Sequence, residues 1–248
     1  MSDQSEARVA LVTGAAGTMG EATVRRLAAD GYRISLVDLS LERVSSLAAE
    51  LGRAAHAIAA DLADAALAEQ AVAETEQVLG PVDVLVNNAG ILSTHKAAET
   101  TPEEWHRVIA VNLDPAFFLA RRVLPGMKAR RFGRIVNICS LAMKSGGLTA
   151  GTAYTVSKGA LAALTFSLAR EAAPFGVTVN AISPAYVKTP MVTEQLTEAQ
   201  RQILLAQIPV GRFCEPEEFA HCVAFLVSPL SGFITGEILD LNGGLHFD

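Results

Sequence analysis

The chain has 248 residues, of which 50% are hydrophobic and 19% charged, and its formal net charge is −6 at pH 7. The apolar fraction excludes a disordered chain, and the acidic balance argues against nucleic acid as a partner, because nucleic-acid binders carry clustered Lys and Arg. Three scattered cysteines, and five histidines without ligand spacing, predict neither a disulfide framework nor a bound metal.

The N-terminal segment lacks the pattern of a targeting sequence. It carries Asp3 and Glu6 and leads only into the short apolar run of residues 9–12, whereas a signal peptide needs a basic start and a longer apolar stretch. No run of the sequence approaches the roughly 18 apolar residues of a membrane-spanning helix. We therefore expect a cytoplasmic protein with reduced thiols and no membrane partner.

Short apolar runs alternate with helical patterns along the chain. Strands are predicted at residues 8–12, 33–37, 54–60, 82–86, 134–139, 178–182 and 237–241. Helices are predicted from a glycine turn to residue 30, from the cap Ser40 to 51, over 63–79, from a capping box at 101–104, over 154 to about 173 and over 216–227. The alternation predicts an α/β fold, a single doubly wound Rossmann-type domain over 1–248 with a parallel seven-stranded sheet and helices on both faces.

A glycine-rich turn follows the first predicted strand. Gly14, Gly17 and Gly20 let the backbone approach a pyrophosphate, whose charge rests on the helix N-terminus. A tight turn without a ligand is the alternative, because the spacing is not the standard G-x-G-x-x-G. Asp38 ends the second strand 18 residues after Gly20, where a carboxylate binds both ribose hydroxyls and repels a 2′-phosphate. No arginine immediately follows it, which favours NAD over NADP; capping of the next helix is its alternative role.

Tyr154 and Lys158 are four residues apart, on one face of a predicted helix. A phenol is a poor base at neutral pH, but a nearby ammonium group and a cationic nicotinamide ring favour its phenolate form. Tyr154 would then accept a proton from an alcohol or donate one to a ketone. Ser140 follows the fifth predicted strand, at the carboxyl edge where open α/β sheets bind ligands, and its hydroxyl would hold the substrate oxygen.

Together these residues resemble the classical short-chain dehydrogenase/reductase family over nearly the whole chain. The matching stretches are residues 13–20, Asp61, residues 87–90, Asn112, Ser140, Tyr154 with Lys158, and residues 184–189. The resemblance implies a catalytic tetrad in which Tyr154 is the acid/base and Ser140 orients the reacting oxygen. Lys158 would hold the nicotinamide ribose, and Asn112 would support a water relay to Lys158.

The same resemblance assigns further residues to NAD. Asp61 would bind the adenine amino group, and Thr189 with the Val187 backbone would hold the carboxamide. The predicted cofactor residues are Gly14, Gly17, Thr18, Met19, Gly20, Asp38, Asp61, Leu62, Asn88, Ala89, Gly90, Tyr154, Lys158, Pro184, Val187 and Thr189. Asn87 has an alternative role, which is to satisfy backbone groups between strands.

Two departures from the family pattern stand out. Gly17 and Thr18 occupy positions where the classical pattern has a non-glycine and a glycine, so the spacing resembles the extended branch of the family. Chains of that branch are longer and add a substrate domain, which favours the classical branch here. Ala185 replaces the glycine of the usual Pro-Gly, where its β-carbon narrows the space near the nicotinamide, or strains the turn if its φ is positive.

Substrate choice is expected to depend on a loop and short helix at about 185–210 that covers the site. The predicted substrate contacts are Ser140, Ala142, Lys144, Tyr154, Ala185 and Tyr186. The C-terminal segments 231–236 and 241–246 resemble 3-oxoacyl thioester reductases, acting on acyl carrier protein or CoA thioesters, which generally use NADPH. Because Asp38 favours NAD, the main hypothesis is NAD-linked oxidation of a secondary alcohol such as a sugar, polyol or hydroxy acid. The alternatives are thioester reduction and a dinucleotide-binding protein without turnover.

Two further expectations concern partners. His95, Lys96, Lys144 and Lys188 lie in segments that should rim the pocket, which suggests attraction of an anionic small-molecule substrate; solvated lysines are the alternative. The family resemblance also implies a homotetramer or homodimer joined through long helices. The mostly apolar stretch 161–169 fits that role, and burial against the core is its alternative.

Overall fold

A computed structural model describes residues 7–190, 194 and 197–247 of the chain. The N-terminal segment without a targeting pattern lies almost wholly outside these residues, and so do residues 191–193 and 195–196 of the predicted substrate-covering segment. Among the described helices, none is long and apolar enough to cross a lipid bilayer.

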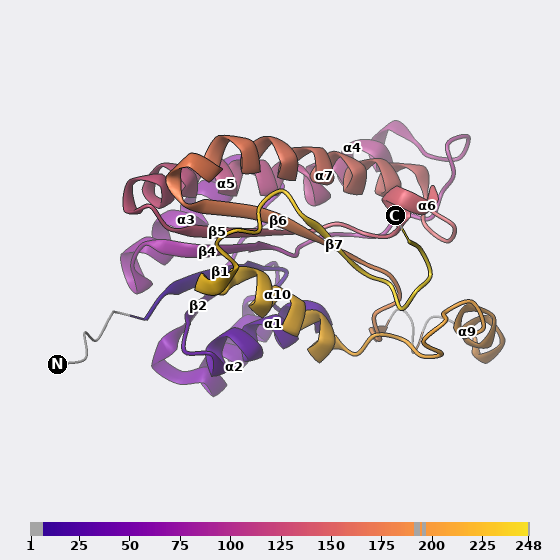
Figure 1. The fold of residues 1–248 in the computed structure, drawn as a ribbon, viewed down its shortest axis with the longest axis horizontal. Coiled ribbons are helices and arrows are strands. Elements are labelled where there is room, and N and C mark those ends of the chain that lie inside the picture. The colour runs from indigo at the N-terminus through magenta and orange to yellow at the C-terminus, as the bar shows by residue number, and fades with distance from the viewer. Residues whose placement is uncertain (1–6, 191–193, 195–196, 248) are drawn as a thin grey trace.

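Seven strands form one parallel sheet, in the order β3-β2-β1-β4-β5-β6-β7 (Figure 1). They are β1 (Val9–Thr13), β2 (Arg33–Asp38), β3 (Ala55–Ala59), β4 (Val82–Asn87), β5 (Gly133–Ile138), β6 (Val177–Pro184) and β7 (Ile238–Leu241). All five residues of β1 and all eight of β6 are buried, because helices cover both faces of a parallel sheet. The predicted Rossmann-type α/β fold with a parallel seven-stranded sheet is confirmed.

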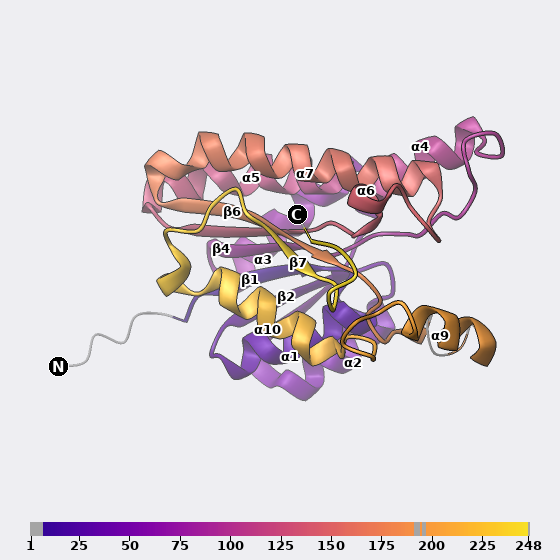
Figure 2. The same cartoon turned by 45° about the vertical axis from the view of Figure 1, so that its right-hand side comes forward.

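The helices form two layers, one on each side of the sheet (Figures 1 and 2). One layer contains α1 (Thr18–Ala29), α2 (Leu41–Leu51) and α10 (Pro216–Val227). The other contains α3 (Ala65–Leu79), α5 (Asp114–Arg130) and α7 (Thr152–Ala172), with α4 (Pro102–Asn112) packed against α7. Phe219 is the largest fully buried side chain of the first layer, and Leu119 and Met127 of α5 fill the second.

The order in which the chain adds strands to the sheet reverses at β1. The chain passes from β1 to β2 on one side, and β4 pairs with β1 on the other side. Open α/β sheets bind their ligands outside the carboxyl ends of the strands at such a point. The ends of β1, β2 and β4 therefore mark where the site should lie, and the short helices α6 (Ala142–Ser145) and α9 (Glu198–Leu205) follow strands at the same edge.

Two local predictions need correction. The long helix α5 has no counterpart among the predicted helices, because Pro115 and Pro125 interrupt its pattern. The capping box at α4 is only half formed. Thr101 accepts the backbone N–H of Glu104 at 3.2 Å, but the Glu104 carboxylate binds the side chains of Ser93 and His95 instead of returning to the cap.

Candidate active site

The turn between β1 and α1 requires glycine at two positions, Gly14 and Gly20. Gly14 has a φ of 62°, which favours glycine. A Cβ on Gly20 would lie 2.1 Å from the carbonyl oxygen of Gly14, so α1 could not approach the turn with any larger residue there. Gly17 differs, because its φ is −80° and its added Cβ would meet that oxygen at an ordinary 3.4 Å. Thr18 begins α1 with helical backbone, which explains why this position does not require the family's glycine.

Thr13 and Asn88 join this turn to the segment after β4. The Thr13 hydroxyl accepts the backbone N–H groups of Asn88 and Ala89, each at 3.0 Å. The Asn88 amide donates to the carbonyls of Thr13 at 3.0 Å and Gly14 at 3.1 Å. The other amide atom, Asn88 Oδ1, is buried and has no hydrogen-bond partner among the described residues. An unsatisfied acceptor beside a glycine turn fits a ligand that donates a hydrogen bond there.

A cavity of about 530 Å³ opens at this edge of the sheet. The predicted cofactor residues that line it are Gly14, Gly17, Thr18, Met19, Gly20, Asp38, Asp61, Leu62, Asn88, Ala89, Gly90 and Thr189. The remaining ones, Tyr154, Lys158, Pro184 and Val187, do not line it. The glycine cradle, the N-terminus of α1 and the free Asn88 oxygen fit a dinucleotide with its pyrophosphate on the helix.

The cavity also contains side chains that the motifs did not indicate. Arg43 and Arg107 both line it, as do Ile91 and Val111. Arg107 and Val111 are one turn apart on α4, a spacing that indicates a shared helix face. Arg43 lies in the first turn of the helix after Asp38. Neither position carries a motif, so only the fold reveals them.

Two carboxylates mark the end of the cavity formed by β2 and β3. Asp38 Oδ2 accepts the N–H of Ala16 at 2.9 Å, and its Oδ1 accepts the N–H of Leu39 at 2.8 Å. Asp38 therefore both faces the cavity and binds the backbone ahead of α2, so its two predicted roles are compatible. Asp61 accepts the N–H of Ala63 at 3.1 Å and lies 3.8 Å from Arg107 Nη1.

The catalytic tetrad predicted from the family comes from β5, α4 and α7. Lys158 is 4% exposed, donates to the Ile138 carbonyl at 2.6 Å, and has its Nζ 5.7 Å from the centre of the Tyr154 ring. Asn112 is 3% exposed, and its amide is fixed by two hydrogen bonds with the Ile91 backbone, at 2.8 and 3.0 Å. Ser140 follows β5, and its hydroxyl accepts the N–H of Ala142 at 3.2 Å.

Gly90 lies beside two of these side chains, Asn112 and Lys158. A Cβ on Gly90 would lie 3.3 Å from Asn112 Oδ1 and 3.4 Å from Lys158 Nζ. The structure therefore brings Asn112 and Lys158 to a residue that also lines the cofactor cavity, and Lys158 in turn lies beside the Tyr154 ring. No hydrogen bond between side chains of the tetrad is present among the described contacts, so the assignment rests on this proximity. Burial raises the pKa of the neighbouring Cys139 thiol to about 11.

The segment before Tyr154 is fixed to the segment after β4. Gly151 donates its N–H to the Ser93 carbonyl at 2.6 Å, and a Cβ there would lie 2.5 Å from the His95 carbonyl oxygen. Lys96 Nζ donates to the carbonyls of Ala150, at 2.7 Å, and Gly147. These contacts set the position at which α7 begins, two residues before Tyr154.

The basic residues expected at the rim are already paired. Lys144 lies 2.7 Å from Asp240, and Lys188 lies 3.1 Å from Glu215. His95 contacts Glu104 at 2.7 Å, which raises the pKa of the imidazole, and hydrogen bonds from Ser93 and His95 lower the pKa of the Glu104 carboxyl. Among the described contacts, Lys96 donates only to carbonyls and keeps its charge, so carboxylates offset three of the four basic residues, and the anionic substrate stays a prediction.

The remaining predicted substrate contacts are distributed over two places. Ala142 is 9% exposed at the start of α6. Ala185 and Tyr186 line a separate cavity of about 140 Å³ together with Val210 and Asn242. Among the described residues, Arg131 is the one non-glycine with a positive φ, so the suggested strain at Ala185 is wrong. The predicted short helix near residue 200 is present as α9.

Asn87 contacts a side chain, not the strand backbone that was its suggested partner. Its amide donates to Asn137 Oδ1 at 2.8 Å, and the Asn137 amide donates to the Thr165 hydroxyl at 2.8 Å. This buried chain joins β4, β5 and α7, and so connects the helix that carries Tyr154 and Lys158 to the sheet.

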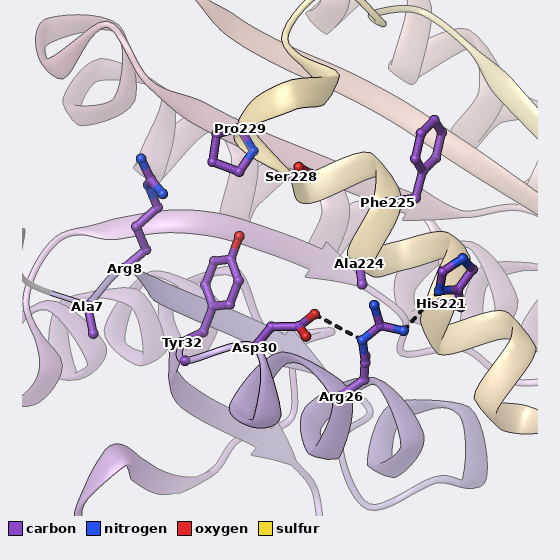
Figure 3. Close-up of a pocket in the computed structure, with 11 residues that line it drawn as sticks. Ala7, Arg8, Arg26, Asp30, Tyr32, His221, Ala224, Phe225, Ser228 and Pro229 are labelled. Atoms are coloured by element: carbon purple, nitrogen blue, oxygen red, sulfur yellow. Dashed lines mark hydrogen bonds and ion pairs between the residues drawn. The ribbon is translucent and has the colours of Figure 1, made fainter.

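A larger cavity, of about 700 Å³ (Figure 3), lies at the opposite end of the strands, beside Arg8 before β1 and Tyr32 before β2. There the hydroxyl of Tyr32 donates to the Val227 carbonyl at 3.4 Å, and Arg26 contacts both Asp30 and His221 at 2.9 Å. None of the predicted site residues lines it. Because sheets of this type bind ligands at the carboxyl ends of their strands, we assign the site to the cavity of about 530 Å³ that Gly14 and Gly90 line.

The chain is similar to known proteins over nearly its whole length. A family model described as enoyl-(acyl carrier protein) reductase matches residues 14–246. Acetoacetyl-CoA reductase of Rhizobium meliloti is 40% identical, over 97% of this chain and 99% of that protein. The 3-oxoacyl-[acyl-carrier-protein] reductase FabG of Escherichia coli is 37% identical, over 97% and 98%. A crystal structure titled short-chain dehydrogenase/reductase, glucose/ribitol dehydrogenase, from Brucella melitensis has a TM-score of 0.89 and 36% identity, with 97% of each chain covered.

Proposed function

Because the chain belongs to the short-chain dehydrogenase/reductase family, we propose that this oxidoreductase reduces 3-oxoacyl thioesters to 3-hydroxyacyl thioesters. The substrate class is supported by the full-length similarity to acetoacetyl-CoA reductase and to 3-oxoacyl-[acyl-carrier-protein] reductase. Thioester reduction, the alternative hypothesis from the sequence, is thus better supported than the main one, NAD-linked oxidation of a secondary alcohol.

The proposal is carried by one observation: Asn112 and Lys158 meet at Gly90, and the Lys158 ammonium lies 5.7 Å from the centre of the Tyr154 ring. The cavity lined by Gly14, Gly20 and Asp38 would hold a nicotinamide dinucleotide, which would supply the hydride. The Tyr154 hydroxyl then donates a proton to the carbonyl oxygen of the substrate, and the Ser140 hydroxyl holds that oxygen. Lys158 is fixed by the Ile138 carbonyl, so its charge stays beside Tyr154 and favours the phenolate left after proton transfer.

NAD-linked alcohol oxidation remains the second candidate, for a specific reason. Asp38 faces the cavity at the end of β2, where a carboxylate binds the ribose hydroxyls of NAD(H) and repels a 2′-phosphate. Thioester reduction and alcohol oxidation use the same proton transfer at Tyr154 in opposite directions. They differ in the substrate and in the direction in which the hydride moves.

A substrate comparison tests the proposal. Purified protein is given acetoacetyl-CoA with NADH or NADPH, and separately NAD⁺ with a sugar, a polyol and a hydroxy acid, while the absorbance of the reduced nicotinamide is followed. We expect kcat/KM for the thioester to exceed that for each alcohol by at least about tenfold, a transition-state difference of roughly 1.4 kcal/mol. Turnover of an alcohol without turnover of the thioester would refute it. Absence of turnover with all substrates would instead favour a non-catalytic dinucleotide-binding protein.

Removing the phenol tests the role of Tyr154. Tyr154→Phe should lower kcat by about 10²–10⁴-fold, the usual contribution of a general acid, while dinucleotide binding is retained. Tyr32→Phe is the matched control, because Tyr32 lies in the cavity at the opposite end of the strands, and it should keep full activity. Equal kcat for Tyr154→Phe and the parent would reject the assignment.

For assembly, we propose a homodimer or homotetramer formed through the outer faces of α4, α5 and α7. Phe117 is 44% exposed and Phe166 is 52% exposed on these helices, and large exposed aromatic side chains favour association. In the apolar stretch 161–169 of α7, Leu161 and Leu168 are buried while Phe166 is exposed, so one side of the helix faces the core and another faces the exterior. Light scattering after gel filtration should give a dimer or tetramer for the parent and a smaller species for Phe166→Glu. A monomeric parent would contradict the proposal.

A further inference from the structure

Two oppositely charged side chains meet the glycine turn at one residue. Asp38 Oδ2 accepts the backbone N–H of Ala16 at 2.9 Å, and an Arg43 N–H donates to the carbonyl of the same residue. Both side chains line the cavity of about 530 Å³. Arg43 is carried there by the first turn of α2, where its backbone N–H is capped by Ser40 at 3.4 Å. A guanidinium group and a carboxylate thus flank the place expected for the adenosine ribose.

Arg43 and Asp38 do not neutralise each other by direct contact. Neither residue forms an ion pair within the described part of the chain, and Asp38 accepts hydrogen bonds from the backbone N–H groups of Ala16, Leu39 and Ser40. A guanidinium carries five N–H donors in a planar fork that matches the oxygen atoms of a phosphate. The contact of Arg43 with Ala16 uses one of its nitrogens, Nη2, so donors remain for a ligand.

We infer that Arg43 is a specificity-determining residue that admits a 2′-phosphate beside Asp38, so that the pocket binds NADP(H) as well as NAD(H). This inference rests on the proposed dinucleotide function of the cavity. Asp38 alone repels a phosphate, and a guanidinium on the other side of Ala16 compensates for that repulsion through charge-assisted hydrogen bonds. The ribose hydroxyls of NAD(H) remain served by the carboxylate.

Binding of two adenosine nucleotides isolates the phosphate from the chemistry of the reaction. Adenosine 5′-monophosphate and adenosine 2′,5′-bisphosphate differ only in the group that Arg43 is inferred to contact, and calorimetry gives a Kd for each without turnover. The variants are Arg43→Gln, Arg43→Lys, Asp38→Asn and the control Arg53→Gln. Arg53 is an exposed arginine in the 3₁₀ turn after α2, at the opposite end of that helix from Arg43, and it does not line the cavity.

We expect the parent to bind both nucleotides with Kd values within about tenfold, or 1.4 kcal/mol, of each other. Arg43→Gln should weaken bisphosphate binding by about tenfold or more and change monophosphate binding by less than about twofold. Arg43→Lys should restore part of the loss, because it keeps the charge but not the fork. Asp38→Asn should strengthen bisphosphate binding, and Arg53→Gln should change neither Kd.

Three results would overturn the inference. If Arg43→Gln weakens both nucleotides equally, Arg43 supports the turn and does not read the phosphate. If the parent binds the monophosphate and excludes the bisphosphate, Asp38 prevails and Arg43 does not compensate for it. If the folded parent binds neither nucleotide, the proposed dinucleotide site fails, and the role of Arg43 fails with it.

Discussion

Gly20 is the position at which the structure predicts the largest effect from one added methyl group. A Cβ there would lie 2.1 Å from the Gly14 carbonyl oxygen, whereas real Cβ atoms essentially never approach closer than 3.0 Å, so Gly20→Ala must open the turn by about 0.9 Å. The atoms that must move are backbone atoms of Gly14 and Ala15, which no rotamer change can relieve. We therefore place the cost at the upper end of overpacking, about 3 kcal/mol. In a chain of this size that lowers Tm by roughly 6–12 °C.

Gly17→Ala is the matched control, since it adds the same group to the same turn. Its Cβ would meet the Gly14 oxygen at 3.4 Å, and its φ of −80° suits alanine. We expect a Tm change within about 3 °C, because a poorer helix cap is offset by the reduced entropy of the unfolded chain. Thermal unfolding followed by circular dichroism gives both values. Equal melting temperatures for the two variants would refute the reasoning that close backbone approach, and not glycine content, fixes this turn.

Three other properties follow from the structure. No thiol should react quickly with Ellman's reagent in the native protein at pH 8, because burial raises the pKa values of Cys139 and Cys214 to about 11 and raises that of Cys222. All three thiols should react after unfolding, and a fast-reacting thiol in the native protein would contradict this. The Arg212 guanidinium and a backbone N–H lower the pKa of Glu218 to about 2, so its stabilising effect is complete above pH 4.5 and is lost as the pH falls toward 2. Calorimetry should therefore show the Tm difference between the parent and Glu218→Gln shrinking over that range, and a constant difference would speak against it. Asn137→Val removes the partner of the Asn87 amide and should cost about 1–3 kcal/mol, or roughly 2–12 °C of Tm, so an unchanged Tm would show that the buried chain contributes little.

The strands were predictable because the sheet is parallel and covered on both sides. A strand buried on both faces must be apolar throughout, and the runs at β1 and β6 are buried along their whole length. Helix ends with glycine in the left-handed region were equally clear. Gly31 and Gly80, with φ of 88° and 97°, follow α1 and α3 as expected. Both signals are local and require no knowledge of the fold.

Helix α5 was not predictable in the same way. Pro115 lies in its first turn, where no intrahelical donor is needed, but Pro125 lies inside the helix and removes a hydrogen bond. Buried side chains at Leu119, Val123 and Met127 recur every four residues and pack into the core formed with α3 and α7. That tertiary packing keeps the helix continuous despite the proline, and a propensity argument from the sequence does not contain it.

The residues of the cofactor cavity likewise fall into two groups, those that the sequence predicts and those that only the fold brings there. Gly14, Gly20 and Asp38 act through backbone geometry and strand ends, so a short motif predicts them. Arg43 and Arg107 reach the cavity from the exposed surfaces of α2 and α4, and on a helix such residues look like any solvated arginine. With them, the adenosine end of the cavity holds two cations beside its two carboxylates. Asp38 taken alone predicts exclusion of a 2′-phosphate. The sign of the electrostatic preference depends on charges brought in by neighbouring helices, and those are set by the fold and not by the motif.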